Sequence, residues 1–254
     1  MRESIEIVYN GISSAELGGI QIHDDGGLFT EQFVADKSIV EEKIRGRDEP
    51  YFYGVEREPL SFTLSFWFDT ELSVEKKREI ARWLDQDYYK PLYTVDNPER
   101  IYYAMCTDSS EHIHNGIEFG YVTLNFRTNS PYAFSPVYEK EFDFSNNTEN
   151  GMEFVFDNKG DVICKPYLKI KMLEDGDLTI INMTDRGREF KFVELAKNEL
   201  LEIDCIREVI TSDTLLSRYN NFNGNYLEFL PYRENHLKVF GKCIIKMKYQ
   251  FKFK

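Results

Sequence analysis

Residue types suited to catalysis or metal binding are sparse in this sequence, and two of its four histidines lie close together. His112 and His114 flank one isoleucine, so an extended backbone would place both imidazole rings on the same side. Two imidazoles are half of a tetrahedral zinc site. The surrounding residues 109–116 resemble an exposed hairpin tip, and the spacing fixes no third ligand. We therefore expect a solvated loop rather than a metal centre.

Two short acidic segments are the next candidates for a metal site. Residues 24–27 read Asp-Asp-Gly-Gly and residues 174–177 read Glu-Asp-Gly-Asp, and calcium prefers such clustered oxygen ligands. Neither segment continues into the EF-hand pattern with its terminal glutamate. Acidic turns that contain glycine are common in β proteins. The sequence predicts ordinary turns at both places, with no metal and no cofactor.

The sequence also lacks the common motifs of enzymes. It contains no G-x-S-x-G nucleophile motif, no P-loop and no G-x-G-x-x-G dinucleotide motif. A pair of carboxylates for glycoside hydrolysis could be assembled by folding, but 44 acidic residues give no reason to select one pair. We predict that the protein is not an enzyme, and a glycosidase or peptidase is the least favoured alternative.

Charge and cysteine usage narrow the choice of partners and compartment. The 254-residue chain has a formal net charge of -13, which argues against nucleic acid because phosphate affinity depends on Lys and Arg. The acidity is uneven, since residues 1–135 carry a net -11 and residues 136–254 a net -2. No apolar segment is long enough for a signal peptide or a membrane helix. The four cysteines have no metal-binding spacing and strand-like neighbours, so we expect buried free thiols in a reducing cytoplasm.

The elements that would position any site are mainly β-strands. Apolar residues alternate with polar ones over residues 60–68 and 122–127, as in a sheet with one buried face. One segment has helical periodicity instead. Ser73 is a suitable N-cap for a helix over 74–84, with Val74, Ile80, Ala81 and Leu84 predicted on its apolar face. The first half should therefore be an α+β domain.

Prolines at positions 131 and 136 follow a strong strand and mark the predicted domain junction. We assign residues 1–135 to one domain and residues 136–254 to a second. The second contains short strands separated by turns rich in Asn, Asp and Gly, which is typical of a β-sandwich. Over residues 242–254, lysines alternate with apolar residues, which favours an edge strand with one wet face over a nucleic-acid site.

A group of aromatic residues near several asparagines suggests a second function. Aromatic rings stack on pyranose faces while amides bond sugar hydroxyls, so the second domain could be a carbohydrate-binding module for host cell-wall saccharide. The alternative is that these rings belong to a core strand end and a polar loop. The candidate saccharide contacts are Tyr219, Phe222, Tyr226 and Tyr232.

The order of short motifs along the whole chain resembles the distal tail protein (Dit) family of long-tailed bacteriophages, the siphovirus tail components. In the first half these are Ile44–Asp48, Glu58-Pro59 before the strand at 60–68, the helix ending in Trp83-Leu84, Pro91-Leu92, Asp96–Tyr103 and Phe126–Pro136. In the second half they include Asn158, Gly160, Pro166, Gly176, Asn182, Gly187, Ile203-Asp204, Leu230-Pro231 and Asn235. The family often has a glycine soon after that Leu-Pro, where this chain has Tyr232-Arg233-Glu234.

This resemblance implies an N-terminal domain that forms a ring, commonly hexameric, from a β-sandwich, a helix and a hairpin that closes the ring. It also implies a peripheral C-terminal β-sandwich of galectin-like or jelly-roll type. The implied role is a structural hub in the virion tail tip, made in the host cytoplasm. The implied partners are further copies of the chain, the tail tube protein, and tail-associated lysin or receptor-binding proteins, with no membrane and no specific nucleic acid.

Ring closure needs complementary patches on one subunit, and one charged segment could supply them. Arginines lie there beside glutamates, although a merely solvated segment is the alternative reading. The candidate contacts between subunits are Arg45, Arg47, Glu56, Arg57 and Glu58.

Overall fold

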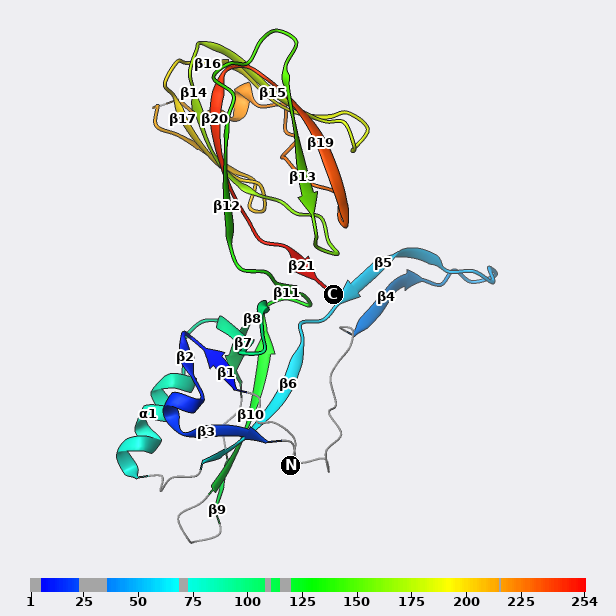
Figure 1. Ribbon diagram of the computed structural model, residues 1–254. Helices are drawn as coiled ribbons and strands as arrows, with labels where there is room; N and C mark the ends of the chain where they lie inside the picture. Colours follow the sequence, from blue (N-terminus) through cyan, green and yellow to red (C-terminus); the bar gives the residue numbers. More distant parts are fainter. Residues whose placement is uncertain (1–5, 23–35, 69–72, 108–110, 115–119, 215) are drawn as a thin grey trace. The chain divides into compact units, whose positions relative to one another are not determined.

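The computed structural model describes residues 6–22, 36–68, 73–107, 111–114, 120–214 and 216–254 (Figure 1). The chain divides into two compact units between Phe134 and Ser135. Both are built from antiparallel strands, so the predicted mainly β fold is confirmed. Among the described helices, none is long and apolar enough to cross a membrane.

The N-terminal unit is organised around one antiparallel sheet with the strand order β2-β1-β7-β8-β10-β6-β3. Strand β9 pairs with β10, and β11 pairs with β8. The strand bounds are β1 Ile7–Tyr9, β2 Ile12–Ser13, β3 Gly19–Ile22, β6 Ser61–Phe68, β7 Lys90–Thr94, β8 Asn97–Cys106, β9 Glu111–His114, β10 Gly120–Thr128 and β11 Ala133–Phe134. A short 3-10 helix, η1, covers Ala15–Leu17.

Helix α1 spans Val74–Leu84, as its N-cap predicts. The Ser73 hydroxyl accepts a hydrogen bond from the Lys76 N–H, which satisfies one of the unpaired donors of the first turn. The predicted apolar face was wrong in part. Val74 and Ala81 are exposed, whereas Trp83 is buried beside Ile80 and Leu84, because the wide indole rather than the first-turn valine reaches the sheet.

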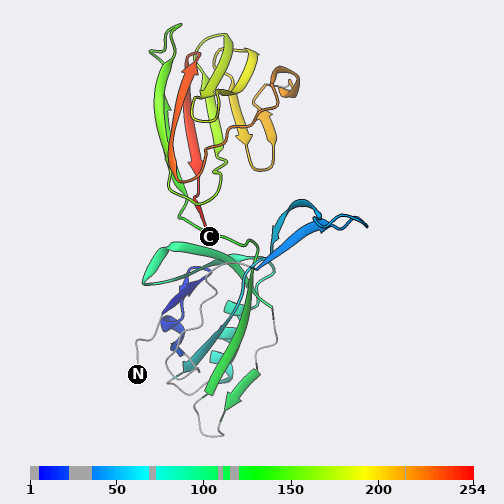
Figure 2. The same ribbon diagram turned by 90° about the vertical axis from the view of Figure 1, so that its right-hand side faces the viewer.

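The centre of this unit's core is Tyr9 on β1, which is fully buried. Its ring makes edge-to-face contacts with Trp83 of α1 and Phe126 of β10, and the Trp83 indole N–H donates to the Tyr9 carbonyl over 2.8 Å. Burial raises the pKa of Tyr9 to about 12, with a further rise from Cys106. The aromatic cluster thus holds α1 against one face of the sheet (Figure 2).

The C-terminal unit is a sandwich of two antiparallel sheets, with the orders β12-β20-β14-β17-β18 and β13-β19-β15-β16. The first sheet contains β12 Tyr138–Asp143, β14 Tyr167–Met172, β17 Leu200–Asp204, β18 Val209–Ser212 and β20 Cys243–Tyr249. The second contains β13 Met152–Asn158, β15 Gly176–Asn182, β16 Arg188–Leu195 and β19 Arg233–Phe240. Strand β21 covers Lys252–Phe253, and a 3-10 helix, η2, covers Tyr219–Asn221.

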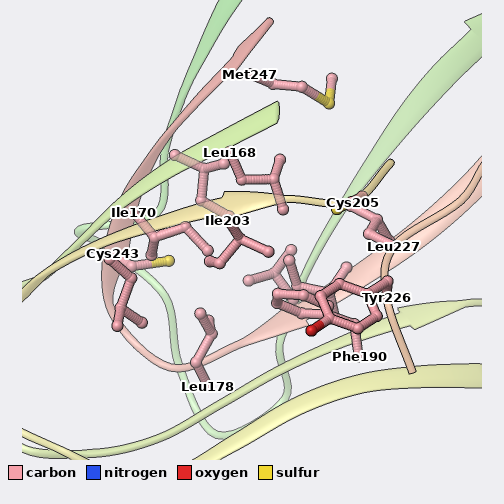
Figure 3. Packing of buried hydrophobic residues seen from close by; sticks show 14 of the residues in the cluster. Leu168, Ile170, Leu178, Phe190, Ile203, Cys205, Tyr226, Leu227, Cys243 and Met247 are labelled. Carbon is pink, nitrogen blue, oxygen red and sulfur yellow. The ribbon is translucent and has the colours of Figure 1, made fainter. Parts of the chain in front are cut away.

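The two sheets bury a common apolar core (Figure 3). Leu168 and Ile203 of the first sheet and Leu178 of the second are completely inaccessible to solvent. Complete burial of a side chain of this size contributes about 1.5–3 kcal/mol. The alternation of buried and exposed residues along β14 and β15 is the period expected of a sandwich strand.

Strand β20 corrects the prediction of a C-terminal edge strand, because it lies between β12 and β14. Its lysines do face solvent. Lys246 pairs with Glu141 at 3.0 Å and Lys248 pairs with Glu139 at 3.1 Å. The alternation of lysine and apolar residues therefore reflects cross-strand charge pairing rather than protection of an edge.

Three buried asparagines hold the irregular segment that precedes β19. Asn158 and Asn182 donate to the carbonyls of Phe229 and Glu228, each over 3.1 Å. Asn235 accepts from the Leu230 N–H over 2.8 Å. Phe229 also forms an isolated bridge with Cys164, and the asparagine amides bond further backbone groups, so the segment is fixed without forming a continuous strand.

The four cysteines are free, and Cys164, Cys205 and Cys243 are buried while Cys106 is partly exposed. Burial raises the pKa of each of the three buried thiols to about 12. The expected free thiols are thus confirmed, and three of them pack as small apolar side chains in the sandwich.

Candidate interaction surfaces

Of the candidate metal-binding segments, only the acidic turn at 174–177 has described side chains. Residues 24–27 and the side chains of His112 and His114 lie outside the described residues. The acidic turn at 174–177 is used in ordinary contacts, since Asp175 accepts from the Lys197 N–H and Asp177 accepts from the Glu194 N–H. Within the described ranges, no group of three potential ligands is close enough to hold a metal ion.

Among the described residues of the N-terminal unit, exposed apolar side chains gather on a two-stranded hairpin, β4 Lys37–Glu42 and β5 Tyr51–Arg57 (Figure 1). The register places Ile39 opposite Val55 and Glu41 opposite Phe52. Cross-strand partners share one face of a hairpin, and the register shift between Val40 and Glu41 brings Phe52 onto the face of Ile39 and Val55. We call these three residues the apolar face of the hairpin.

This apolar face is open to solvent. Ile39, Phe52 and Val55 are 63%, 64% and 46% exposed. A two-stranded hairpin alone in water is marginally stable, and apolar groups at this exposure mark an interaction surface rather than a core. The other face carries Tyr53, whose hydroxyl donates to Glu42 over 2.9 Å; that hydrogen bond raises the pKa of Tyr53.

The predicted subunit contacts fall at opposite ends of this hairpin. Arg45 and Arg47 lie in its turn, where Arg47 donates to the Tyr51 hydroxyl and stacks over that ring at 4.8 Å. The remaining candidates, Glu56, Arg57 and Glu58, lie at its base. At about 3.3 Å per residue, the length of β5 separates the two groups by roughly 20 Å, so they would meet different parts of a partner.

Reasoning from the sequence missed the apolar character of this hairpin. The charges at positions 41–49 dominated the interpretation, although Ile39-Val40 and Tyr51-Phe52-Tyr53 flank them. Two apolar runs on either side of a turn with glycine are a hairpin signal, and Gly46 adopts φ 92° in that turn.

The four candidate saccharide contacts do not form one exposed group. Phe222 stacks on Phe192 at 4.6 Å, and Tyr226 is buried with its hydroxyl donating to the Glu208 carbonyl. Tyr219 is exposed, but its hydroxyl accepts from the Ile210 N–H. Tyr232 is 80% exposed and has φ 53°, so this tyrosine itself makes the tight turn for which the related family often uses glycine.

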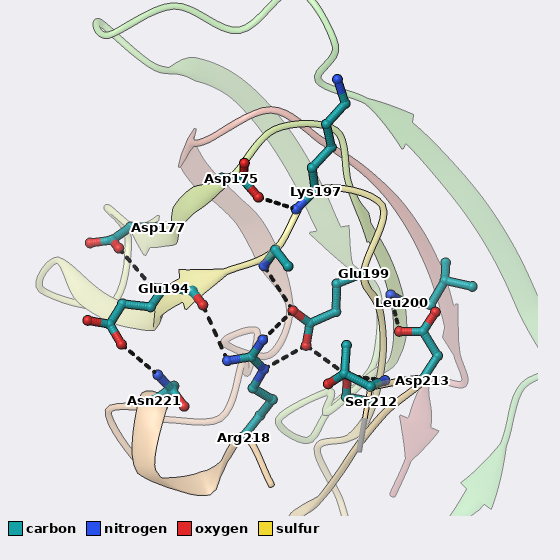
Figure 4. Close-up of polar contacts among 12 residues, drawn as sticks. Asp175, Asp177, Glu194, Lys197, Glu199, Leu200, Ser212, Asp213, Arg218 and Asn221 are labelled. Carbon is teal, nitrogen blue, oxygen red and sulfur yellow. Dashed lines mark hydrogen bonds and ion pairs between the residues drawn. The ribbon is translucent and has the colours of Figure 1, made fainter. Parts of the chain in front are cut away.

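A buried ion pair fastens the segment between β18 and β19 to the sandwich (Figure 4). Arg218 makes two parallel bonds to Glu199, which also accepts from the Ala196 N–H and the Ser212 hydroxyl. Asn223 then bonds the backbone of Lys191 on β16. We call residues 213–214 and 216–226 the strap; it covers the side of the sandwich formed by β16 and β18.

Comparison with known proteins gives consistent matches over the whole chain. The curated relative found is the SPbeta prophage-derived uncharacterized protein YomH of Bacillus subtilis (strain 168), which is 32% identical over 100% of this chain and 99% of its own length. Among solved structures, the Dit protein (gp 19.1) of phage SPP1, described as a paradigm of hub adsorption apparatus in phages infecting Gram-positive hosts, superposes with a TM-score of 0.72. It shares 14% identity and covers 98% of this chain and 100% of its own.

A chain from the activated baseplate of phage P2 superposes with a TM-score of 0.51 at 9% identity, covering 99% of this chain and 98% of its own. Because both structural matches are low in identity, they establish the fold alone. The family assignment rests on sequence. Residues 3–130 match the phage tail protein N-terminal domain family and residues 132–249 match the phage tail C-terminal domain family. Together with the full-length prophage relative, these matches show that the chain belongs to the phage tail protein family.

Proposed function

We propose that this chain is the distal tail hub of a phage or prophage, a structural protein whose copies form a closed hexameric ring at the tail tip. The observation that carries the proposal is the superposition of both units, in order, on the SPP1 Dit protein with a TM-score of 0.72. A likeness confined to one domain would be compatible with many roles; one that includes both domains supports a shared architecture.

The hairpin supplies the contact that such a ring needs. A heterologous contact joins two different surfaces of the same subunit and closes when the rotation between copies completes a circle. The apolar face of the hairpin would cover one surface of the next copy. Arg45 and Arg47 at the tip, and Glu56, Arg57 and Glu58 at the base, would then add polar contacts at two separate places on that neighbour.

The two units divide the work in this proposal. The N-terminal unit would form the ring and meet the tail tube protein. The C-terminal sandwich would lie at the periphery and meet the tail-tip proteins, such as a tail-associated lysin or receptor-binding protein. We further propose that the chain has no catalytic role and that it is made in the host cytoplasm before it joins the virion.

Oligomeric state and location test the proposal together. We expect analytical ultracentrifugation of the full chain to show a hexamer at micromolar concentration or after the tube protein is added. Negative-stain images should show rings with a central opening, and antibody labelling of virions should mark the distal end of the tail. Label along the tube or on the capsid, or a chain that stays monomeric with tube and tip proteins present, would refute the hub.

A surface variant separates the role of the hairpin from general solubility. Replacing Ile39, Phe52 and Val55 with Ser, Ser and Thr should abolish the ring and leave a folded monomer. The matched control replaces Met183, Ile206 and Leu216 in the C-terminal unit, which are 59%, 60% and 64% exposed, with serine. The control should still assemble; if both variants form rings, the hairpin is not the ring contact.

A further inference from the structure

The two lateral sides of the C-terminal sandwich differ in how far other segments of the chain cover their edge strands. On one side, the strap covers the edges of β16 and β18 and forms hydrogen bonds to both sheets, including Tyr219 to Ile210 and Asn223 to Lys191. On the other side, β12 and β13 are the last strands of their sheets. Within the described residues, no strand pairs with the outer edge of either.

The uncovered side exposes aromatic side chains that belong to the interior. Phe142 of β12 and Phe154 of β13 lie 4.5 Å apart between ring centroids, and both are only half-buried. Tyr138 contacts Tyr249 in the same way further along. We call Tyr138, Phe142 and Phe154 the aromatic seam. The Lys140 ammonium lies over the Phe142 ring, and among the described residues the strap covers only the other side, so these inward-facing rings stay half-buried.

The two free edges are not equivalent. Strand β12 has three consecutive charged residues, Glu139 to Glu141, and charge on an edge strand opposes pairing with another chain. Strand β13 has the sequence MEFVFDN. Met152 and Val155 are exposed on its opposite faces, so each face offers an apolar contact to a new strand, and on the outer face that contact lies between Glu153 and Asp157.

Charge on the outer face of β13 indicates what that strand should carry. Asp157 lies directly opposite Glu234, and Glu153 lies opposite Lys238. Two carboxylates facing each other across a ladder are unfavourable. A cation beside Asp157 would offset this repulsion, so a partner strand should have Lys or Arg on its outer face and apolar side chains on its inner face.

The same domain already contains such a pair. Strand β12, with Glu139 and Glu141 outward, binds β20, whose Lys246 and Lys248 face them at about 3 Å while Met247 points into the core. Strand β13 likewise has acidic residues outward and aromatic residues inward, but its partner β19 supplies a cation only opposite Glu153, through Lys238, and places Glu234 opposite Asp157. A cation for Asp157 would have to come from the free edge.

We propose that the free edge of β13, together with the aromatic seam, is a docking site for an extended cationic segment of another tail protein. That segment would add a fifth strand to the β13-β19-β15-β16 sheet. Backbone hydrogen bonds along β13 would provide affinity, and alternating apolar and basic side chains would provide specificity. The site is independent of the hairpin and does not require a ring.

The test uses the full chain and a short peptide in which lysine alternates with valine and tyrosine. Two peptide controls keep the composition. One groups the lysines at one end, and the other carries N-methyl groups on alternate amides so that one edge cannot donate hydrogen bonds. Fluorescence anisotropy should give binding by the alternating peptide alone, with amide shifts or exchange protection in nuclear magnetic resonance confined to β13 and the seam.

Two protein variants identify the edge. Asp157→Lys relieves the repulsion with Glu234, so the domain should stay folded. Because it reverses one charge contact with the added strand, it should lower the affinity for the alternating peptide about threefold to tenfold. The matched control is Glu189→Lys on the far strand β16, where affinity should not change. Equal binding by the N-methylated peptide, protection centred on β12 or β18, or no saturation at about 1 mM would overturn the proposal.

Discussion

Glu199 and Arg218 form a bidentate ion pair inside the C-terminal sandwich, with Nε and Nη2 of the arginine 2.7 and 2.6 Å from the two carboxylate oxygens. Their side chains are 0% and 7% exposed. Two charges at such depth are stable only when they are paired and hydrogen-bonded. The Arg218 Nη1 also donates to the Glu194 carbonyl, so one guanidinium joins β16, the following turn and the strap.

Removing one partner should therefore cost more than removing both. Arg218→Met leaves a buried carboxylate without its cation, and we expect the free energy of unfolding to fall by about 3–5 kcal/mol. The double variant Glu199→Gln/Arg218→Met should be more stable than Arg218→Met alone. Urea denaturation followed by near-ultraviolet circular dichroism measures both. The control Arg188→Ala breaks a more exposed pair with Glu228 and should cost at most about 1 kcal/mol.

The Glu199–Arg218 pair should make the stability of the C-terminal domain depend on pH. Burial alone raises the pKa of Glu199, but hydrogen bonds from Arg218, the Ala196 N–H and Ser212 outweigh it and lower the pKa below its usual 4.5. The contribution of this group is therefore fully present above pH 4.5 and is lost as the pH falls through the folded-state pKa. The stability difference between the natural chain and Glu199→Gln should shrink as the pH falls. A difference that stays constant with pH would contradict this account.

Tyr232 has a left-handed backbone at φ 53° with its side chain exposed. A non-glycine residue in this conformation destabilises the folded state by about 1–2 kcal/mol. Glycine removes that strain, but it also makes the unfolded chain more flexible, which offsets part of the gain. We expect Tyr232→Gly to stabilise the domain by up to about 1 kcal/mol. Tyr232→Ala keeps the strain while removing the ring, so it should be neutral or slightly destabilising. Thermal unfolding distinguishes the two variants.

Thiol reactivity should report the packing of the sandwich. Because burial raises the pKa of Cys164, Cys205 and Cys243 to about 12, little thiolate forms near pH 8 and the sulfurs are shielded. A maleimide reagent should label Cys106 first in the native protein and all four cysteines in denaturant. Mass spectrometry of peptides would identify the sites. Rapid native labelling of Cys205 would show that the core opens readily.

The tip of the hairpin should affect association more than folding. Residues 43–47 contain Lys43, Arg45 and Arg47 and no acidic residue, within an otherwise acidic half. Reversing charge with Arg45→Glu/Arg47→Glu should slow ring assembly and reduce its sensitivity to salt, because exposed charges steer encounter. The control Arg186→Glu/Arg207→Glu in the C-terminal unit should assemble normally. Stopped-flow light scattering at two ionic strengths measures the rates.

Local signals in the sequence predicted single helices and strands better than they predicted which strands lie side by side. Ser73 gave the start of α1 because capping depends on adjacent residues. The central position of β20 could not be read locally, since it depends on strands more than seventy residues away. Periodicity also ranked Val74 above Trp83 as a core residue, although only the sheet decides which side chain is covered.

The candidate surfaces were harder to predict than the fold. The charged residues of the hairpin were visible in the sequence, but exposure of Ile39, Phe52 and Val55 was not, because apolar residues in strands are usually buried. Likewise, aromatic residues near asparagines could not be sorted into core and surface. Phe222 and Tyr226 pack inside while Tyr219 and Tyr232 are exposed, and that separation depends on the path of the strap.

The pairing of the first strands of the sandwich with its last ones also governs how the domain is made. Tyr138 on β12 lies opposite Tyr249 on β20, and Met152 on β13 lies opposite Val239 on β19. Contacts between residues so distant in sequence form slowly, and during synthesis they must wait until β19 and β20 have been made. The nascent domain therefore stays open at the ribosome until these strands emerge, and a message truncated before β20 yields a sheet in which β12 and β14 lack the strand that joins them.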